Sequence, residues 1–208
     1  MEHSMTSESN QQQLYQFCGY ELKITQDFKH LTVPAMIWDA GIVLCRYFEE
    51  TRINFTGKKV IELGSGTGLV GILASLLGGE VTLTDRPNVL NQIVYNVNSN
   101  IPSELIARTK VSALQWDHPH DQYASKYDII IGSDIVYDPR QFQPLINMLL
   151  HLSNPDTVIY FSSKLIKNIA AVVFYEKKLP MHFDFEIVHT LPHQLINVYK
   201  ITRRIDSD

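Results

Sequence analysis

The sequence predicts an α/β fold built on a mostly parallel sheet, and three observations favour it. Short apolar stretches suited to buried strands alternate with longer stretches of helical apolar spacing through the middle of the chain. One stretch, residues 127–132, is nearly all apolar, which is typical of a central parallel strand that is covered on both faces. Two segments of period two, residues 183–189 and 196–202, close the chain and indicate a terminal strand pair.

The predicted elements follow one another without an internal repeat or an interior linker. The polar residues 1–13 are expected to form a disordered tail, and residues 14–208 a single domain that begins with a small β-hairpin, 14–33. The other expected strands are 60–63, 80–84, 110–114, 127–132, 158–162, 183–189 and 196–202, and the expected helices are 36–50, 69–77, 87–98, 142–152 and 169–178.

Composition excludes several classes of protein. The 208 residues carry a net charge of −4 without a long run of one sign, which disfavours a nucleic-acid substrate. The cysteines, Cys18 and Cys45, form neither a metal-binding spacing nor a disulfide framework, as is usual in a reducing compartment. No apolar run has the length of a membrane span, and the first residues lack the apolar core of a signal peptide. We therefore expect a soluble, cytoplasmic protein without direct membrane or nucleic-acid partners.

A glycine-rich loop follows the strand expected at 60–63. Gly64, Gly66 and Gly68 allow the backbone to turn sharply and to approach a ligand without an intervening Cβ atom. The apolar helix that comes next offers free N–H groups at its start, so the pattern is typical of a nucleotide cradle. The dinucleotide fingerprint would need a glycine where Leu69 stands, and no Gly-Lys-Ser/Thr follows that could make a phosphate-binding P-loop.

Two acidic residues narrow the choice of ligand. Glu62 stands beside the loop, where a negative charge would oppose a pyrophosphate but would suit a cationic ligand. Asp85 ends the next strand, where an acid can accept hydrogen bonds from both hydroxyls of a ribose. S-adenosylmethionine carries a sulfonium, an ammonium and a ribose, and no phosphate. The joint pattern therefore predicts binding of S-adenosylmethionine, with a purely structural glycine turn as the alternative.

The combination of 62–68, Asp85, Trp116 and 133–137 resembles the seven-strand protein-lysine methyltransferases of methyltransferase family 16. The resemblance covers roughly residues 17–204, and its most specific motif is the Asp-x-x-Tyr of 134–137. It implies a Rossmann-like class I methyltransferase sheet of seven strands with the last one antiparallel. It also implies methyl transfer from S-adenosylmethionine, with S-adenosylhomocysteine as product, to a lysine ε-amine of a protein, translation elongation factor 1-alpha. A monomer in the cytoplasm, with centrosomal association, is expected on the same ground.

The resemblance also assigns cofactor contacts by position. By resemblance these are Trp38, Gly64, Ser65, Gly66, Asp85, Trp116 and Ser133, and the loop pattern adds Glu62 and Gly68 to the expected cofactor-binding residues. Trp38 would close over the methionine end of the cofactor, unless it belongs to the core, and Trp116 would lie beside the adenine. Ser65 and Ser133 depart from the alanine that is common in the family, and each adds a hydroxyl near the ligand.

Asp134 and Tyr137 are the expected catalytic residues. Both follow the central strand at its carboxyl end, where open α/β sheets place their ligands. Asp134 would hold or orient the ammonium of the substrate lysine, and the alternative is a helix cap. Tyr137 would wall the lysine channel and stabilise the cation through its ring face, and the alternative is core packing.

The remaining patterns argue against other chemistries. The His-x-His cluster at 117–121 could supply metal ligands. No third histidine lies at a spacing typical of metal-binding motifs, so we expect a solvated loop and no metal. The Asn/Asp-Pro-Pro-Tyr of nucleic-acid amino-methylases is replaced here by the residues at 133–137. Methyl transfer to another protein or to a small amine, and a non-catalytic binding module, are the alternative functions.

Overall fold

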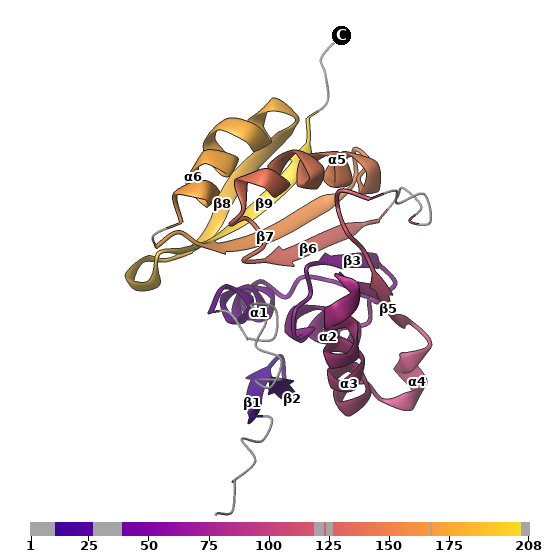
Figure 1. Cartoon of the computed structure of the whole chain (residues 1–208). Helices are drawn as coiled ribbons and strands as arrows, with labels where there is room; N and C mark the ends of the chain where they lie inside the picture. Colours follow the sequence, from indigo (N-terminus) through magenta and orange to yellow (C-terminus); the bar gives the residue numbers. More distant parts are fainter. Residues whose placement is uncertain (1–10, 27–38, 119–122, 124–126, 167, 205–208) are drawn as a thin grey trace, which may run out of the picture.

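A computed structural model describes residues 11–26, 39–118, 123, 127–166 and 168–204. It contains a seven-stranded sheet with helices on both faces, and a separate two-stranded hairpin that lies beyond one of the helical layers (Figure 1). The hairpin, β1 (Gln11–Phe17) and β2 (Tyr20–Gln26), lies on the side of the sheet that α1 (Asp39–Thr51) covers.

The sheet is mostly parallel with its last strand antiparallel, as the sequence predicts. Its strands in spatial order are β5 (Thr109–Ala113), β4 (Glu80–Asp85), β3 (Lys59–Leu63), β6 (Ile129–Ser133), β7 (Val158–Lys164), β9 (Ile196–Arg203) and β8 (Phe183–Leu191). The first five strands are parallel, and β9 runs antiparallel to both of its neighbours. Because β4 and β5 extend the sheet on one side of β3 while β6 and β7 extend it on the other, the topology reverses between β3 and β6. Open α/β sheets bind ligands at the carboxyl ends of strands at such a point.

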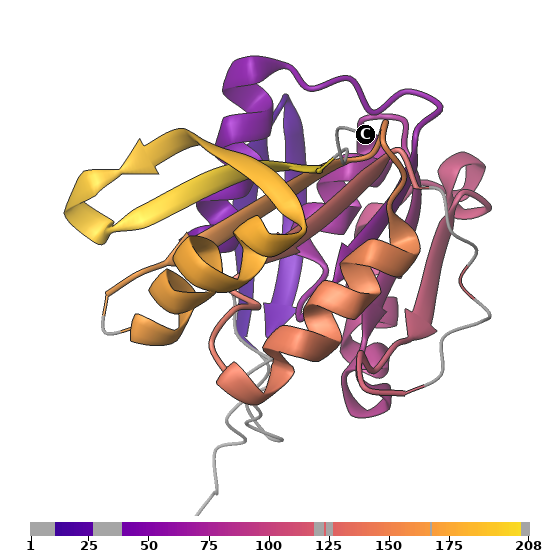
Figure 2. The same ribbon diagram turned by 90° about the horizontal axis from the view of Figure 1, so that it is seen from above.

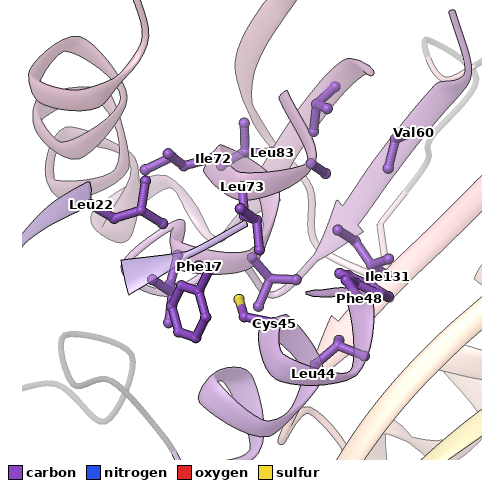
Figure 3. Packing of buried hydrophobic residues seen from close by; sticks show 14 of the residues in the cluster. Phe17, Leu22, Leu44, Cys45, Phe48, Val60, Ile72, Leu73, Leu83 and Ile131 are labelled. Carbon is purple, nitrogen blue, oxygen red and sulfur yellow. The ribbon is translucent and has the colours of Figure 1, made fainter. Parts of the chain in front are cut away.

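Two layers of helices bury the two faces of the sheet, as Figures 1 and 2 show from two directions. One layer contains α1 (Asp39–Thr51), α2 (Leu69–Leu76) and α3 (Leu90–Asn100), and the other contains α5 (Phe142–Leu152) and α6 (Ile169–Val173). Successive strand residues alternate between the layers. Ile131 packs in the core on the α1 side (Figure 3), whereas its neighbour Ile130 packs in the core on the α5 side.

The N-terminal hairpin forms as expected, but it begins earlier. β1 (Gln11–Phe17) and β2 (Tyr20–Gln26) are antiparallel, and the two residues between them have positive φ angles of 52° and 80°, which suit the right-handed twist of a hairpin. The expectation that residues 11–13 belong to a disordered tail is wrong, because they pair in register with residues 24–26. Residues 1–10 and 27–33 of the predicted tail and hairpin lie outside the described residues.

Other elements differ from the predicted ones in type or in extent. The helix expected at 87–98 starts as a 3₁₀ turn, Pro87–Val89, and the one expected at 169–178 continues beyond α6 as a π-helix, Phe174–Lys178. A short helix, α4 (Ser103–Ile106), was not predicted, and the strand expected from residue 127 begins two residues later. Among the described residues, the other 3₁₀ turns are Pro139–Gln141, Leu179–Met181 and Pro192–Gln194. Within the described part of the chain, no helix combines the length and the apolar character that a membrane span needs.

Candidate active site

A cavity of about 680 Å³ opens at the carboxyl ends of β3, β4, β6 and β7, where the sheet topology reverses. Its volume is that of a typical site for a small molecule. The cavity brings together these predicted residues: Gly64, Gly66, Asp85, Trp116, Ser133, Asp134 and Tyr137. Glu62, Ser65 and Gly68 do not line it, and Trp38 lies outside the described residues.

The glycine loop needs its glycines for two separate reasons. Gly64, Gly66 and Gly68 all have positive φ angles, of 61°, 57° and 84°, which L side chains rarely adopt. A Cβ atom on Gly64 would also lie 2.8 Å from Cγ2 of Ile135, in the segment that follows β6. The loop after β3 and the segment after β6 therefore pack against each other more closely than any other residue at 64 would allow.

Glu62 does not have the role that we expected from the sequence. Its side chain is 1 % exposed, faces α2, and accepts hydrogen bonds from the Gly71 N–H at 3.1 Å and from the Ser65 hydroxyl. Burial raises the pKa of Glu62 to about 8, although both hydrogen bonds act in the opposite direction. The carboxyl is therefore mostly protonated at neutral pH. It ties the loop to α2 and presents no negative charge to a ligand in the cavity.

Ser65 and Gly68 stabilise the conformation of the loop but do not line the cavity. Ser65 pairs twice with Thr84 of β4: its N–H donates to the Thr84 carbonyl at 2.9 Å, and its Oγ accepts from the Thr84 N–H at 3.0 Å. Gly68 starts α2, and a Cβ atom there would lie 3.2 Å from Cδ2 of Leu83. The structure thus places both residues in the framework of the loop, next to the cavity lining.

Asp85 faces the cavity in an orientation fixed by the backbone. Its Oδ2 accepts from the Gly66 N–H at 2.8 Å and its Oδ1 from the Arg86 N–H at 2.7 Å. Burial raises its pKa, and the two hydrogen bonds counteract this effect. Each carboxylate oxygen can accept more than one hydrogen bond, so both remain able to bind a pair of vicinal hydroxyls.

Asp134 is held at the end of β6 in a backbone conformation that is uncommon for a residue other than glycine. Its φ angle is 52°, its N–H donates to the Ser162 carbonyl at 2.9 Å, and its Oδ1 accepts from the Lys164 N–H at 2.8 Å. Non-glycine residues in this region cluster at functional sites. Burial raises the pKa of Asp134 to about 6, against the hydrogen bond from Lys164, so the carboxyl is mostly anionic at neutral pH. The helix-cap alternative is wrong, because Asp138 caps the turn that follows by accepting from the Arg140 N–H.

Tyr137 lines the cavity and is 55 % exposed, so the core-packing alternative is wrong as well. The backbone just before it is held by Asn168, whose Nδ2 donates to the Val136 carbonyl at 3.0 Å. The Oδ1 of Asn168 accepts from the Ala171 N–H and so caps α6. Our sequence reasoning missed Asn168, although an asparagine directly before a helical pattern is a recognisable cap signal.

One ion pair beside the cavity was not predicted. Lys164 ends β7 and lines the cavity, and its Nζ lies 2.5 Å from Oδ2 of Asp39, at the first residue of α1. These two residues are 125 positions apart in the chain, so no local pattern signals the pair.

The His-x-His cluster at 117–121 is only partly described. His118 Nδ1 lies 2.8 Å from Asp117 Oδ1, and residues 119–122 lie outside the described residues.

The sheet and its two helical layers form the Rossmann-like fold of class I methyltransferases. A solved structure of this class, the 16S rRNA N2 G1207 methyltransferase RsmC of T. thermophilus in complex with AdoMet and guanosine, matches 94 % of this chain and 51 % of its own length, with a TM-score of 0.66 and 16 % identity. The glycopeptide N-methyltransferase MtfA matches 78 % of this chain and 90 % of its own length, with a TM-score of 0.62 and 14 % identity. At these identities the likeness concerns the fold alone.

Sequence comparison places the chain within that class. The chain belongs to the lysine methyltransferase family, whose model matches residues 16–178. "EEF1A lysine methyltransferase 3" of Xenopus tropicalis is 46 % identical over 190 residues, which are 91 % of this chain and 84 % of the relative. The relative named "Protein N-lysine methyltransferase METTL21A" of the same organism is 40 % identical over 181 residues, 81 % of this chain and 84 % of that protein.

Proposed function

We propose that this protein transfers a methyl group from S-adenosylmethionine to a lysine ε-amine of translation elongation factor 1-alpha. The observation that carries the proposal is one continuous cavity, in which Asp85 and Trp116 lie among the lining residues together with Asp134 and Tyr137. A cofactor site and an acceptor site are thereby joined. The 46 % identity to a relative named for methylation of this factor supports the choice of substrate.

The residues of the cavity suit a cationic nucleoside. Asp85 presents a fixed carboxyl to the ribose, and Trp116 and Leu114 offer apolar surface for a base. The glycine loop has no lysine or arginine that would bind a phosphate, and Asp134 adds an anionic carboxylate. Gly64 and Ser133, at the ends of β3 and β6, are small residues in the lining of the same cavity.

The reaction requires the protein mainly to position the two substrates against each other and to exclude water from the reacting atoms. When bound, S-adenosylmethionine supplies a methyl carbon already activated by a sulfonium. Asp134 holds the incoming ammonium, and the ring of Tyr137 walls its path. Before transfer, the ammonium must lose its proton to water or to a nearby acceptor, because only the neutral amine has a free lone pair. The nitrogen lone pair would then form the bond to the methyl carbon while the carbon–sulfur bond breaks, with its electron pair going to sulfur.

Purified elongation factor 1-alpha and labelled S-adenosylmethionine test this proposal. Label should enter one lysine with the wild-type protein, and mass spectrometry of the product identifies the position and the number of methyl groups. Asp134→Asn and Tyr137→Phe should lower the rate, by roughly tenfold or more for the loss of a charged hydrogen bond at Asp134. Absence of transfer to this factor by the wild-type protein would refute the choice of substrate.

A second protein substrate is the competing candidate, favoured by the 40 % identity to METTL21A. An extract from cells that lack this enzyme separates the candidates. A labelled band at another mass would favour the competitor, and label in small molecules alone would favour a small amine. Cofactor binding without transfer to any acceptor would point to a non-catalytic module. Monomeric state, cytoplasmic location and centrosomal association stay predictions, which size-exclusion chromatography and fluorescence imaging can test.

A further inference from the structure

Three charged side chains from distant parts of the chain lie together beside the cavity, and two of them, Asp134 and Lys164, line it. Asp134 follows β6, Lys164 ends β7, and Asp39 begins α1. Lys164 contacts both acids: its backbone N–H donates to Asp134 Oδ1 at 2.8 Å, and its Nζ lies 2.5 Å from Asp39 Oδ2. The charges of Lys164 and Asp39 also act on Asp134 in opposite directions, since Lys164 lowers its pKa and Asp39 raises it.

The geometry of Asp134 leaves part of its carboxylate unused. Oδ1 is occupied by the Lys164 N–H, and among the described residues no hydrogen bond reaches Oδ2. The carboxyl lines the cavity and is mostly ionised at neutral pH. The Oδ2 atom is therefore the one that can accept a hydrogen bond from an entering ammonium.

The Lys164 ammonium is a built-in competitor for that oxygen. The backbone of Lys164 already touches Asp134, and a lysine side chain is long and flexible enough to turn back toward a neighbouring carboxylate. In the structure it points instead to Asp39. Asp39 is well placed to hold it, because the first turn of α1 is anchored to β7 by a second hydrogen bond, from the Ser162 hydroxyl to the Ala40 carbonyl at 2.8 Å.

We propose that Asp39 is a positioning residue for methyl transfer, which binds the Lys164 ammonium and so keeps Asp134 available to the lysine of the substrate. The inference rests on the proposed function, because it assumes that the acceptor is a lysine. Without the Asp39 carboxylate, Lys164 turns to Asp134 and neutralises it. The enzyme then carries its own lysine in the place that the substrate ammonium has to occupy.

Crystal structures test the geometry without any acceptor. In Asp39→Asn, the Lys164 Nζ should lie within hydrogen-bond distance of the Asp134 carboxylate. Continued orientation of Lys164 away from Asp134 would overturn the inference, whatever the substrate of the enzyme proves to be. Failure of wild-type transfer to elongation factor 1-alpha would refute the proposed substrate and leave this structural test in force.

Kinetics with purified elongation factor 1-alpha test the consequence. Asp39→Asn should raise the KM for the protein acceptor by roughly two- to fivefold, the range of one partly exposed charge interaction, with little change in the affinity for S-adenosylmethionine. The double variant Asp39→Asn/Lys164→Met should return the KM toward that of Lys164→Met alone, because the competing ammonium is gone while the backbone N–H to Asp134 remains. An unchanged KM in the single variant, or no recovery in the double variant, contradicts the inference.

A matched control shows that the effect is specific. Glu186→Gln also removes an acid from an ion pair, with Lys200 at 3.1 Å, on the strand pair β8–β9 and away from the cavity lining. It should leave the acceptor KM unchanged. A KM increase in the control equal to that of Asp39→Asn would show that loss of any such pair is sufficient, and would overturn the assigned role of Asp39.

Discussion

The carboxyl groups of Glu62 and Asp134 both lie near the cavity. They show that the role of an acid depends on its burial and on the direction in which its side chain points. The sequence shows that each lies at the end of a strand, and we expected both to act on a cation. The alternation along β3 places Glu62 on the same face as Val60, under α2, whereas Asp134 follows the last residue of β6 and lines the cavity. Strand periodicity could have corrected our expectation for Glu62, because side chains within a strand face a layer of helices and those just beyond its end face the ligand.

The protonation of Glu62 makes a pH-dependent contribution to stability. Its pKa rises from 4.5 to about 8 on folding, because burial disfavours the charged form. A carboxyl with a raised pKa in the folded state stabilises the fold most below the unfolded value, and this stabilisation is lost as pH rises through the folded value. The melting temperature of the wild-type protein should therefore fall relative to that of Glu62→Gln between pH 4.5 and about 8. The exposed Glu104→Gln is the control, and parallel curves for wild type and Glu62→Gln would contradict the raised pKa.

The orientation of Asp85 leads to a prediction for cofactor affinity. Asp85→Asn retains the size of the side chain but removes a charged acceptor that faces the cavity. Loss of one charged hydrogen bond costs about 1.5–3 kcal/mol, so calorimetry should show that the Kd for S-adenosylmethionine rises by roughly ten- to a hundredfold. Asp184→Asn, on the exposed face of β8, should leave the Kd unchanged. Equal affinities for wild type and Asp85→Asn would remove Asp85 from the ribose site.

At the scale of elements, the hairpin and the glycine loop are connected through one buried side chain. Asn96 of α3 is 0 % exposed, and its Oδ1 accepts from the Thr25 N–H at 2.9 Å. Its Nδ2 donates to the Thr25 carbonyl at 3.0 Å and to the Thr67 carbonyl, in the loop, at 2.9 Å. The period-two pattern predicts the hairpin itself, but its attachment depends on a contact between residues 71 positions apart, which a local pattern cannot reveal.

Substitution of Asn96 should therefore affect both the stability of the fold and the binding of the cofactor. Asn96→Asp keeps the acceptor but places an oxygen against two carbonyls that lose their donor, and each buried group left unpaired costs about 1–3 kcal/mol. We expect a lower melting temperature and a higher Kd for S-adenosylmethionine. Asn98→Asp, on the exposed side of the same helix, should change neither. A lower melting temperature with an unchanged Kd would restrict Asn96 to a structural role.

At the scale of the whole molecule, the fold was more predictable than the site. The alternation of strands and helices and the glycine loop are local patterns, and from them the sheet, its helices and the place of the cavity could be predicted. The acid pair that flanks Lys164 and the packing of Ile135 over Gly64 arise where separate strands end side by side. The order of the strands in space determines which residues become neighbours there. Local sequence patterns therefore do not predict these contacts.

The sheet separates two hydrophobic cores, and this arrangement leads to a prediction for stability. Ile72 of α2 is buried in the core on the α1 side, and Ile146 of α5 in the core on the other side, so the two side chains share no packing partners. Each Ile→Val substitution should lower the free energy of unfolding by about 0.5–1.5 kcal/mol, as expected for the loss of one buried methylene. The double variant should lose the sum of the two values to within about 0.5 kcal/mol, since substitutions at independent sites are additive.

Urea unfolding followed by fluorescence and by circular dichroism measures these free energies. Both signals should change at one midpoint, because the two cores share every central strand. Separate midpoints, or a coupling free energy well above that limit, would mean that the two faces of the sheet do not behave as independent cores of one cooperative domain.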